Sequence, residues 1–334
     1  MQNGSSGPVA TDGGDQYMNE DASEQYDRQI RLWGVEAQQR MSGSRVLFSG
    51  INGVTAEGCK NLLLAGVSAT LQDESLAQAS DVGANFLLDG EDVGKNRAEA
   101  SANNAKELNR LVTVSSETRP LEELPDDFFE SFRVVVLSGA APAQRRRVSA
   151  LCRKLGAAFY TVETFGYDGF LFCDLGPKHI YRREIGQNLS DPFEMEFPSL
   201  SEALAARWSS LKDRWGLPQA VRHSASDRAL PGRVRPTAPP GRRLEVCRRH
   251  GNRLGEERLT FGLSGAGAAD DAAAAVCATA TAEVSPVCAI LGGILGQEVI
   301  KAISGKGAPA CNCIALTGMT GEAKMFRAPA KAKA

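Results

Sequence analysis

The residues of this chain that could do chemistry begin at positions 26–34, which read Tyr-Asp-Arg-Gln-Ile-Arg-Leu-Trp-Gly. Apolar side chains recur here every three or four residues, as on one stripe of a single helix: Tyr26, Ile30, Trp33 and Ala37. Arg28 faces almost directly away from that stripe. Because a guanidinium is always charged and can donate two parallel hydrogen bonds, Arg28 could hold a phosphate across an interface. A solvated surface arginine is the simpler interpretation of the same pattern.

A second stretch has the order of a nucleotide site. Residues 44–49 predict a strand, residues 50–57 (Gly-Ile-Asn-Gly-Val-Thr-Ala-Glu) predict a turn into a helix that ends near Ala65, and residues 69–72 predict a strand that leads to Asp73. This order is that of the βαβ unit that binds nucleotides: a strand, a glycine turn, a helix, a second strand and an acidic residue. In that unit the phosphates bind at the helix N-terminus and the acidic residue binds the ribose. A nicotinamide-dependent oxidoreductase would use this order.

The glycine turn departs from the working form of that unit. Gly50 is kept, but Asn52 and Thr55 stand where a second and a third glycine would let phosphates approach the backbone. We expect the bulk of these two side chains to obstruct the phosphates. This departure disfavours an oxidoreductase that binds its own dinucleotide.

A sheet must position these two stretches, and the following residues predict one. Apolar strands alternate with helices: a helix at 95–110, strands at 112–115 and 132–137, a helix at 144–155 and a strand at 158–161. Alternation of this kind is typical of a parallel, doubly wound sheet. We therefore predict an α/β, Rossmann-like fold with a mostly parallel sheet.

The chain divides by composition. The predicted organisation is a disordered tail at 1–22, a Rossmann-like domain at 23–177, an irregular and partly helical insertion at 178–283, a return to the first domain at 284–326 and a tail at 327–334. Within the insertion we expect a helix at 199–215. The segment 222–258, rich in arginine and proline, predicts a mobile loop that could serve nuclear import or bind an anionic partner.

A last helix is predicted at 285–303, with Ser285 as its N-cap and a stop at Gly305. It contains three glycines, each of which weakens a helix by about 1 kcal/mol relative to alanine: Gly292, Gly293 and Gly296. Their clustering predicts that another backbone packs very close to this helix. A closing strand at 313–316 and a turn at Gly318 precede the tail.

The composition is that of an ordinary soluble protein, with 43% hydrophobic residues and a net charge of -2. A charge so near zero argues against nucleic acid as the main partner. The apolar runs are shorter than the roughly 20 residues of a membrane span, and the N-terminus lacks the apolar core of a signal peptide. We expect a nuclear protein that is also found in the cytoplasm.

The eight cysteines lack the paired Cys-x-x-Cys motifs of structural zinc. Most are expected to be reduced core residues. Cys247 lies among arginines that would favour its thiolate, but its surroundings predict no rigid scaffold for catalysis.

Six blocks together resemble the adenylation fold of ubiquitin-like-protein activating enzymes, the ThiF and MoeB family. They are residues 26–34, 60–67, 94–100, 165–169, 197–204 and 286–298. Within the family they are most similar to small subunits of SUMO-activating heterodimers. Small subunits for neddylation and the N-terminal half of ubiquitin-activating enzymes are the alternatives, and both are much longer than this chain.

The resemblance implies a pseudo-adenylation subunit. Competent members carry an Asn-x-x-Arg-Gln run that grips ATP, whereas residues 83–86 read Gly-Ala-Asn-Phe here, so that Ala84 marks the missing arginine. Ala140 and Ala141 stand at the Asp-Asn positions that serve the nucleotide and its magnesium. Lys95 and Arg97 remain near the family's lysine. The resemblance therefore implies that this chain binds neither ATP nor a metal.

The resemblance also implies a partner. A large catalytic subunit is expected to bind Mg-ATP, adenylate the C-terminal carboxylate of SUMO and capture it as a thioester. Arg28 matches the arginine that enters the partner's ATP site, where its charge would stabilise the triphosphate or the departing pyrophosphate. Arg31 is expected to be structural or interfacial. A pure scaffold without any contribution to the active site is the alternative from another class.

Overall fold

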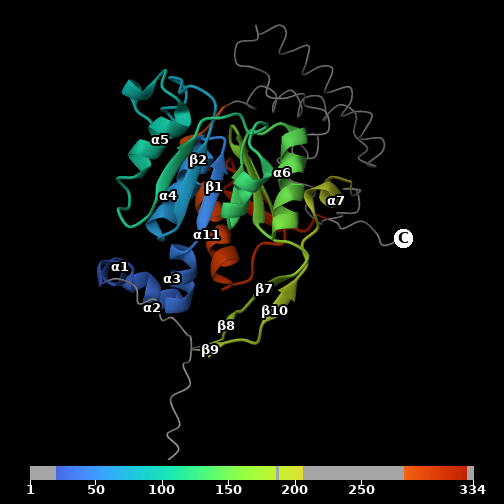
Figure 1. Ribbon diagram of the computed structural model, residues 1–334. Coiled ribbons are helices and arrows are strands. Elements are labelled where there is room, and N and C mark those ends of the chain that lie inside the picture. The colour runs from blue at the N-terminus through green and yellow to red at the C-terminus, as the bar shows by residue number, and fades with distance from the viewer. Residues whose placement is uncertain (1–19, 186–187, 206–281, 329–334) are drawn as a thin grey trace, which may run out of the picture.

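The computed structural model describes residues 20–185, 188–205 and 282–328 (Figure 1). Its centre is an 8-stranded sheet in the order β12-β11-β6-β5-β4-β1-β2-β3. The strands are β1 (Arg45–Ser49), β2 (Ser68–Gln72), β3 (Val114–Glu117), β4 (Val134–Leu137), β5 (Ala158–Phe165), β6 (Asp168–Asp174), β11 (Cys313–Thr317) and β12 (Glu322–Phe326). From β5 to β3 the strands run parallel, and β6, β11 and β12 extend the sheet antiparallel. The mostly parallel α/β prediction is confirmed.

Helices cover both faces of the sheet (Figure 1). They are α1 (Glu20–Gln25), α2 (Asp27–Trp33), α3 (Val35–Ser42), α4 (Gly53–Leu64), α5 (Arg97–Ala105), α6 (Pro142–Leu155), α7 (Leu200–Ala205) and α11 (Ser285–Ser304), with short 3-10 helices η1 (Gly90–Asp92) and η2 (Asp126–Ser131). Successive side chains of a strand point to opposite faces. In β4, Val134 and Val136 therefore join the core under α4 and α11, while Val135 and Leu137 join the core under α6.

The packing of α11 on α4 explains two of its three glycines. A Cβ at Gly292 would lie 2.5 Å from the Cβ of Glu57 and 2.9 Å from the backbone nitrogen of Gly58. A Cβ at Gly296 would lie 2.8 Å from the Cβ of Asn61. The predicted close approach is confirmed at these two positions. It is wrong for Gly293, where a Cβ would meet no atom within 4 Å.

The observed ends and burial of α11 test the predicted helix caps and the prediction that no apolar run spans a membrane. Gly305 stops the helix in the left-handed conformation, as expected, but Val284 and not Ser285 is the N-cap. The helix is also longer than its most apolar run. By length and apolar composition it could cross a membrane, yet 67% of the relevant window is buried in the fold. It is a core helix.

The described part of the predicted insertion contains two small ribbons and one helix. β7 (His179–Tyr181) pairs with β10 (Phe193–Met195), and β8 (Glu184–Ile185) pairs with β9 (Asn188–Leu189). The helix predicted at 199–215 is described as α7 over Leu200–Ala205. The remainder of the predicted range, residues 206–215, lies outside the described residues, as do the segment 222–258 and Cys247.

Candidate functional site

The helix that carries Arg28 is shorter than the apolar stripe suggested. Gly34, with φ at 82°, separates α2 from α3, so the prediction of one continuous helix through Ala37 is wrong. The stripe still anchors both helices, because Tyr26 is 2% exposed and Ala37 is 0% exposed. The hydroxyl of Tyr26 accepts a hydrogen bond of 2.8 Å from Asn109 Nδ2.

The two arginines of this region differ in their partners. Arg31 pairs with Asp27 one turn earlier, at 3.0 Å between Nη2 and Oδ2. Arg28 is exposed, and within the described part of the chain its guanidinium has neither a hydrogen-bond nor an ion-pair partner. A free cation on an anchored helix remains available to an anion outside this chain.

Arg28 also lies at the wrong end of α4 to serve its own glycine turn. Its neighbour Gln29 donates a hydrogen bond of 3.0 Å to the carbonyl of Leu64, the last residue of α4. The glycine turn lies at the other end of this helix. Because α4 has 12 residues, its two ends are about 18 Å apart. Figure 1 shows the same separation, with α2 and α3 beside the start of β1 and not beside its end.

The glycine turn follows β1 and is closed by its own side chains. Gly50 has φ at 82°, and a Cβ there would lie 2.0 Å from the carbonyl oxygen of Ser138. Asn52 is the N-cap of α4 and forms a capping box with Thr55: Thr55 N donates to Asn52 Oδ1 at 3.2 Å, and Asn52 N donates to Thr55 Oγ1 at 2.9 Å. Asn52 Nδ2 also donates to Ser138 Oγ at 2.7 Å. The side chains of Asn52 and Thr55 therefore accept hydrogen bonds from backbone N–H groups that a bound phosphate would otherwise use.

The acid that would hold a ribose is likewise engaged. Asp73 is 4% exposed, and its Oδ2 accepts from Ile51 N at 2.8 Å and pairs with Arg97 Nη2 at 2.9 Å. Arg97 also donates to Asp81 at 3.2 Å. Burial alone would lower the pKa of the Arg97 guanidinium, but the charges of Asp73 and Asp81 outweigh it and raise that pKa. Sequence reasoning noted Arg97 but missed this pairing.

Ala84 and Ala140 lie beside the same turn. Ala84 is 6% exposed, and a Cβ added to Gly53 would lie 2.9 Å from its carbonyl oxygen. The carbonyl of Ala140 accepts from Arg145 Nη2 at 3.1 Å, and Arg145 pairs with Glu163 at 2.9 Å. Ala84 thus lies against the first residue of α4, and Ala140 comes two residues after Ser138, the hydrogen-bond partner of Asn52, which forms the capping box with Thr55.

One contact at this turn has no signal in the sequence. The backbone N–H of Gly53, the first residue of α4, donates to Glu283 Oε2 at 3.0 Å. Glu283 stands 230 residues further along the chain, next to α11. Its carboxylate lies where a phosphate would meet the helix N-terminus.

The remaining polar groups near the turn form no cluster of three metal ligands, because within the described part of the chain no three His, Cys, Asp or Glu side chains are grouped closely enough to hold a metal ion. Lys95 pairs with Asp92 at 2.9 Å and its hydrogen bond lowers the pKa of that carboxyl. The backbone donors of the turn are already used by acceptors of the chain itself, so the turn as it stands offers a phosphate few free N–H groups.

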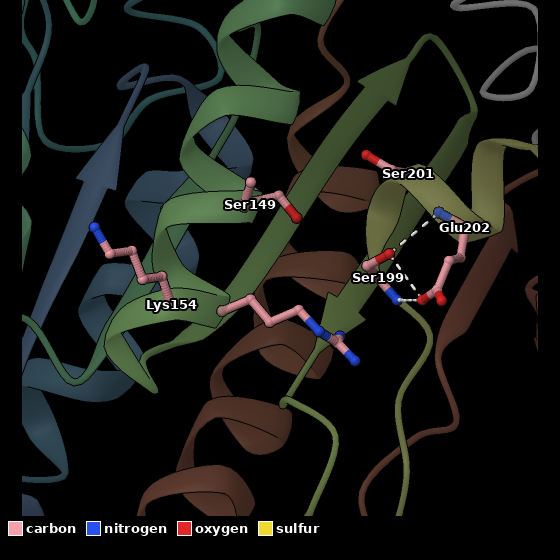
Figure 2. A pocket seen from close by; sticks show the side chains of 7 residues that line it. Ser149, Lys154, Ser199, Ser201 and Glu202 are labelled. Atoms are coloured by element: carbon pink, nitrogen blue, oxygen red, sulfur yellow. Dashed lines mark hydrogen bonds between the residues drawn. The ribbon is translucent and has the colours of Figure 1, made fainter.

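A cavity of about 410 Å³ lies elsewhere, between α6 and α7 (Figure 2). Figure 2 shows Ser149 of α6 on one side and Ser199 with Glu202, hydrogen-bonded to each other, at the start of α7. Arg153 in its wall is held by Asp174 at 2.8 Å. The cavity faces the last turns of α6, whereas the first turn of α6 lies near the glycine turn, so the cavity belongs to another part of the fold.

The described cysteines are free thiols, and all but Cys311 are buried. Burial raises the pKa of the Cys59 and Cys152 thiols to about 12 and that of Cys288 to about 11. Such thiols are protonated near neutral pH and are poor nucleophiles. The prediction that most cysteines are reduced core residues is confirmed for the described cysteines other than Cys311.

Comparison with known proteins agrees with this architecture. The profile of the ThiF family matches residues 26–334. SUMO-activating enzyme subunit 1A of Arabidopsis thaliana is 37% identical over 312 residues, which cover 90% of this chain and 93% of that protein. SUMO-activating enzyme subunit 1 of Xenopus tropicalis is 34% identical over 332 residues, which cover 87% and 91%. A crystal structure of selenomethionine PaaA is similar in fold, with a TM-score of 0.59, 12% identity, and coverage of 96% of this chain and 78% of PaaA.

Proposed function

This chain belongs to the ThiF family, and from that membership we propose that it is the small subunit of a SUMO-activating heterodimer. The names of its relatives support SUMO as the modifier. The chain is then part of an ATP-dependent, ligase-type complex and is not catalytic alone. Its large partner holds Mg-ATP, joins the C-terminal carboxylate of SUMO to AMP with release of pyrophosphate, and then forms the thioester.

The observation that carries this proposal is the closed glycine turn. The N–H groups of Ile51, Asn52, Gly53 and Thr55 all donate within the chain. A phosphate would have to displace these acceptors one by one, and a ribose would have to separate Asp73 from Arg97. The chain's own site therefore works as a structural element that binds no nucleotide, and the same pairing disfavours an oxidoreductase.

In this proposal Arg28 is the residue of this chain that acts on the reacting ATP. Its guanidinium has no partner among the described residues. Arg28 lies on an anchored helix that packs against the C-terminal end of α4, while the glycine turn lies at the other end of α4, about 18 Å away along the helix. In the heterodimer Arg28 reaches the partner's ATP in trans and stabilises charge that develops on the phosphates. A pure scaffold would not need this cation.

We also propose that the complex works in the nucleus, with some of it in the cytoplasm, and that neither nucleic acid nor a membrane is a partner. Small subunits for neddylation or ubiquitin remain the alternatives within the family. An assay of ATP–pyrophosphate exchange with different modifier proteins distinguishes them, because each alternative predicts a different modifier as the carboxylate substrate.

The test is ATP–pyrophosphate exchange by this chain co-purified with its large subunit, measured with SUMO, with ubiquitin and with the modifier of neddylation. We expect exchange that depends on SUMO and on both subunits. Preference for another modifier would move the chain to one of the alternatives. Exchange by the chain alone would contradict the assignment of a closed turn.

A further inference from the structure

The carboxylate of Glu283 connects two distant parts of the chain at the glycine turn. Its Oε2 accepts a hydrogen bond of 3.0 Å from the backbone N–H of Gly53. The backbone on either side is fixed, since Gly166 N donates to the carbonyl of Ala282 at 2.8 Å and Glu283 forms a parallel bridge with Gly166. The carboxylate is therefore held at the start of α4 by the strand end of β5 and by α11, which follows it.

The position of this contact has a specific electrostatic meaning. The N-terminus of a helix carries about half a positive charge, and its first N–H groups point outward toward an acceptor. In strand-turn-helix nucleotide sites this is where a phosphate binds. A carboxylate offers the same sign of charge and the same kind of acceptor oxygen.

The other donors of the turn have acceptors from within the βαβ unit, namely Asp73, Thr55 and Asn52. Gly53 differs, because its acceptor comes from outside that unit. Position 53 also has no space for a side chain, because a Cβ there would lie 2.9 Å from both the Ala84 oxygen and the Cys288 sulfur. Glu283 thus completes a turn that would otherwise present one free donor to an anion.

We infer that Glu283 is an intramolecular anion that occupies the phosphate position of the turn and keeps free anions out of it. The inference rests on the proposed function, in which this turn binds no nucleotide. It adds that the N–H of Gly53 is occupied by the carboxylate of Glu283. Removal of the carboxylate alone should reopen the position to inorganic phosphate, while Asn52, Thr55 and the pair of Asp73 with Arg97 still exclude ATP.

The experiment compares the full chain with E283A, E283Q and E130A, in which E130A removes an exposed carboxylate of the same charge. The melting temperature is measured in sodium chloride and in sodium phosphate of equal ionic strength, and phosphate binding is measured by calorimetry. We expect E283A to melt about 2–4 °C lower than the wild type in chloride. In phosphate E283A should regain most of this loss, with a dissociation constant on the order of millimolar. E130A and the wild type should respond to phosphate equally.

E283Q separates charge from shape, because its amide oxygen still accepts from Gly53 and fills the same space. It should melt lower than the wild type without binding phosphate. An equal phosphate response of E283A and the wild type, or an unchanged melting temperature of E283Q, would overturn the inference. Neither result affects the proposed function, which fails instead if the wild-type chain alone binds ATP in the same calorimeter.

Discussion

The polar groups at the two ends of α4 differ in whether they have partners within the described part of the chain. At its N-terminal end, in the glycine turn, every polar group with a role in nucleotide binding already has a partner: Asn52 with Thr55, Asp73 with Arg97, and Gly53 with Glu283. At its C-terminal end, α2 packs through Gln29 on Leu64 and presents Arg28 with no partner among the described residues.

This contrast shows how a strand-turn-helix unit can hold its shape through its own side chains. The anionic and cationic groups of the turn are satisfied by each other, so the turn stays folded without ATP. Arg28, which has no partner among the described residues, lies on a helix that packs at the opposite end of α4. In the proposed function, such a chain contributes to a reaction on a nucleotide that its partner subunit holds.

The strongest way to break the contrast is Arg28→Ala. We expect adenylation by the heterodimer, measured as SUMO-dependent ATP–pyrophosphate exchange, to fall on the order of 10³-fold, the lower end of the range for an arginine that stabilises phosphoryl charge in trans. Co-elution of the two subunits in gel filtration should not change, because Arg28 has no structural partner within the described chain.

Arg31→Ala is the matched control for that change. It removes the same charge from the same helix but breaks only the exposed pair with Asp27, in which the Arg31 side chain is 77% exposed. Such pairs contribute well under about 1 kcal/mol, so exchange should stay within about twofold. Normal exchange by Arg28→Ala would instead support the scaffold alternative.

The second prediction concerns stability at the closed turn. Arg97→Ala leaves Asp73 as a buried carboxylate without its main countercharge, and we expect a loss of about 3–5 kcal/mol in the free energy of unfolding. Urea denaturation followed by circular dichroism measures this loss. In the double variant Asp73→Asn with Arg97→Met most of it should return, since the most deeply buried carboxylate is then gone and Asp81, which also loses Arg97, is partly exposed. A small effect of Arg97→Ala would show that the turn does not depend on this pair.

The third prediction concerns the helix that supports the turn. Gly292→Ala adds a methyl 2.5 Å from the Cβ of Glu57 and should cost about 1–3 kcal/mol by separating α11 from α4. Gly293→Ala is the control in the same turn of the helix. Its methyl meets no atom within 4 Å, so the better helix propensity of alanine should raise stability by about 0.5–1 kcal/mol. Thermal melts of both variants measure the difference in sign.

The smallest expected effect belongs to the cap of α4. Asn52→Ala removes the acceptor of Thr55 N and the donor to Ser138, and we expect a loss of about 0.5–2 kcal/mol. Asn52→Asp keeps the acceptor and should lose less. A larger loss for Asn52→Asp in the same urea titration would contradict the role of the capping box.

Sequence patterns predicted the elements whose side chains repeat regularly. Val-Val-Val-Leu at β4 is buried along its whole length, as continuous apolar strands are in parallel sheets. Strand β12 was missed, because Glu322–Phe326 has polar residues beside apolar ones and lies mostly exposed at the edge of the sheet, so that within the return segment 284–326 it has no apolar run. The helix break at Gly34 was missed because the apolar spacing continues through it.

The assignment of a degenerate nucleotide site at Asn52 and Thr55 stays a prediction, but the structure shows contacts there that the sequence did not indicate. Asn52 and Thr55 were expected to obstruct phosphates by bulk, whereas the structure shows them using the donors of the turn as a capping box. The partners that complete the closure come from afar: Arg97 lies 24 residues from Asp73, and Glu283 lies 230 residues from Gly53. No local pattern connects such residues, so only the folded chain shows them together.

The most direct test of the central claim is the number of ATP molecules that each species binds. Equilibrium dialysis with radiolabelled ATP and magnesium would be carried out on the isolated chain, on the large subunit and on the heterodimer. The account predicts one nucleotide per heterodimer, the same number for the large subunit, and no saturable binding by the isolated chain. Two nucleotides per heterodimer, or saturable binding by the isolated chain, would contradict it.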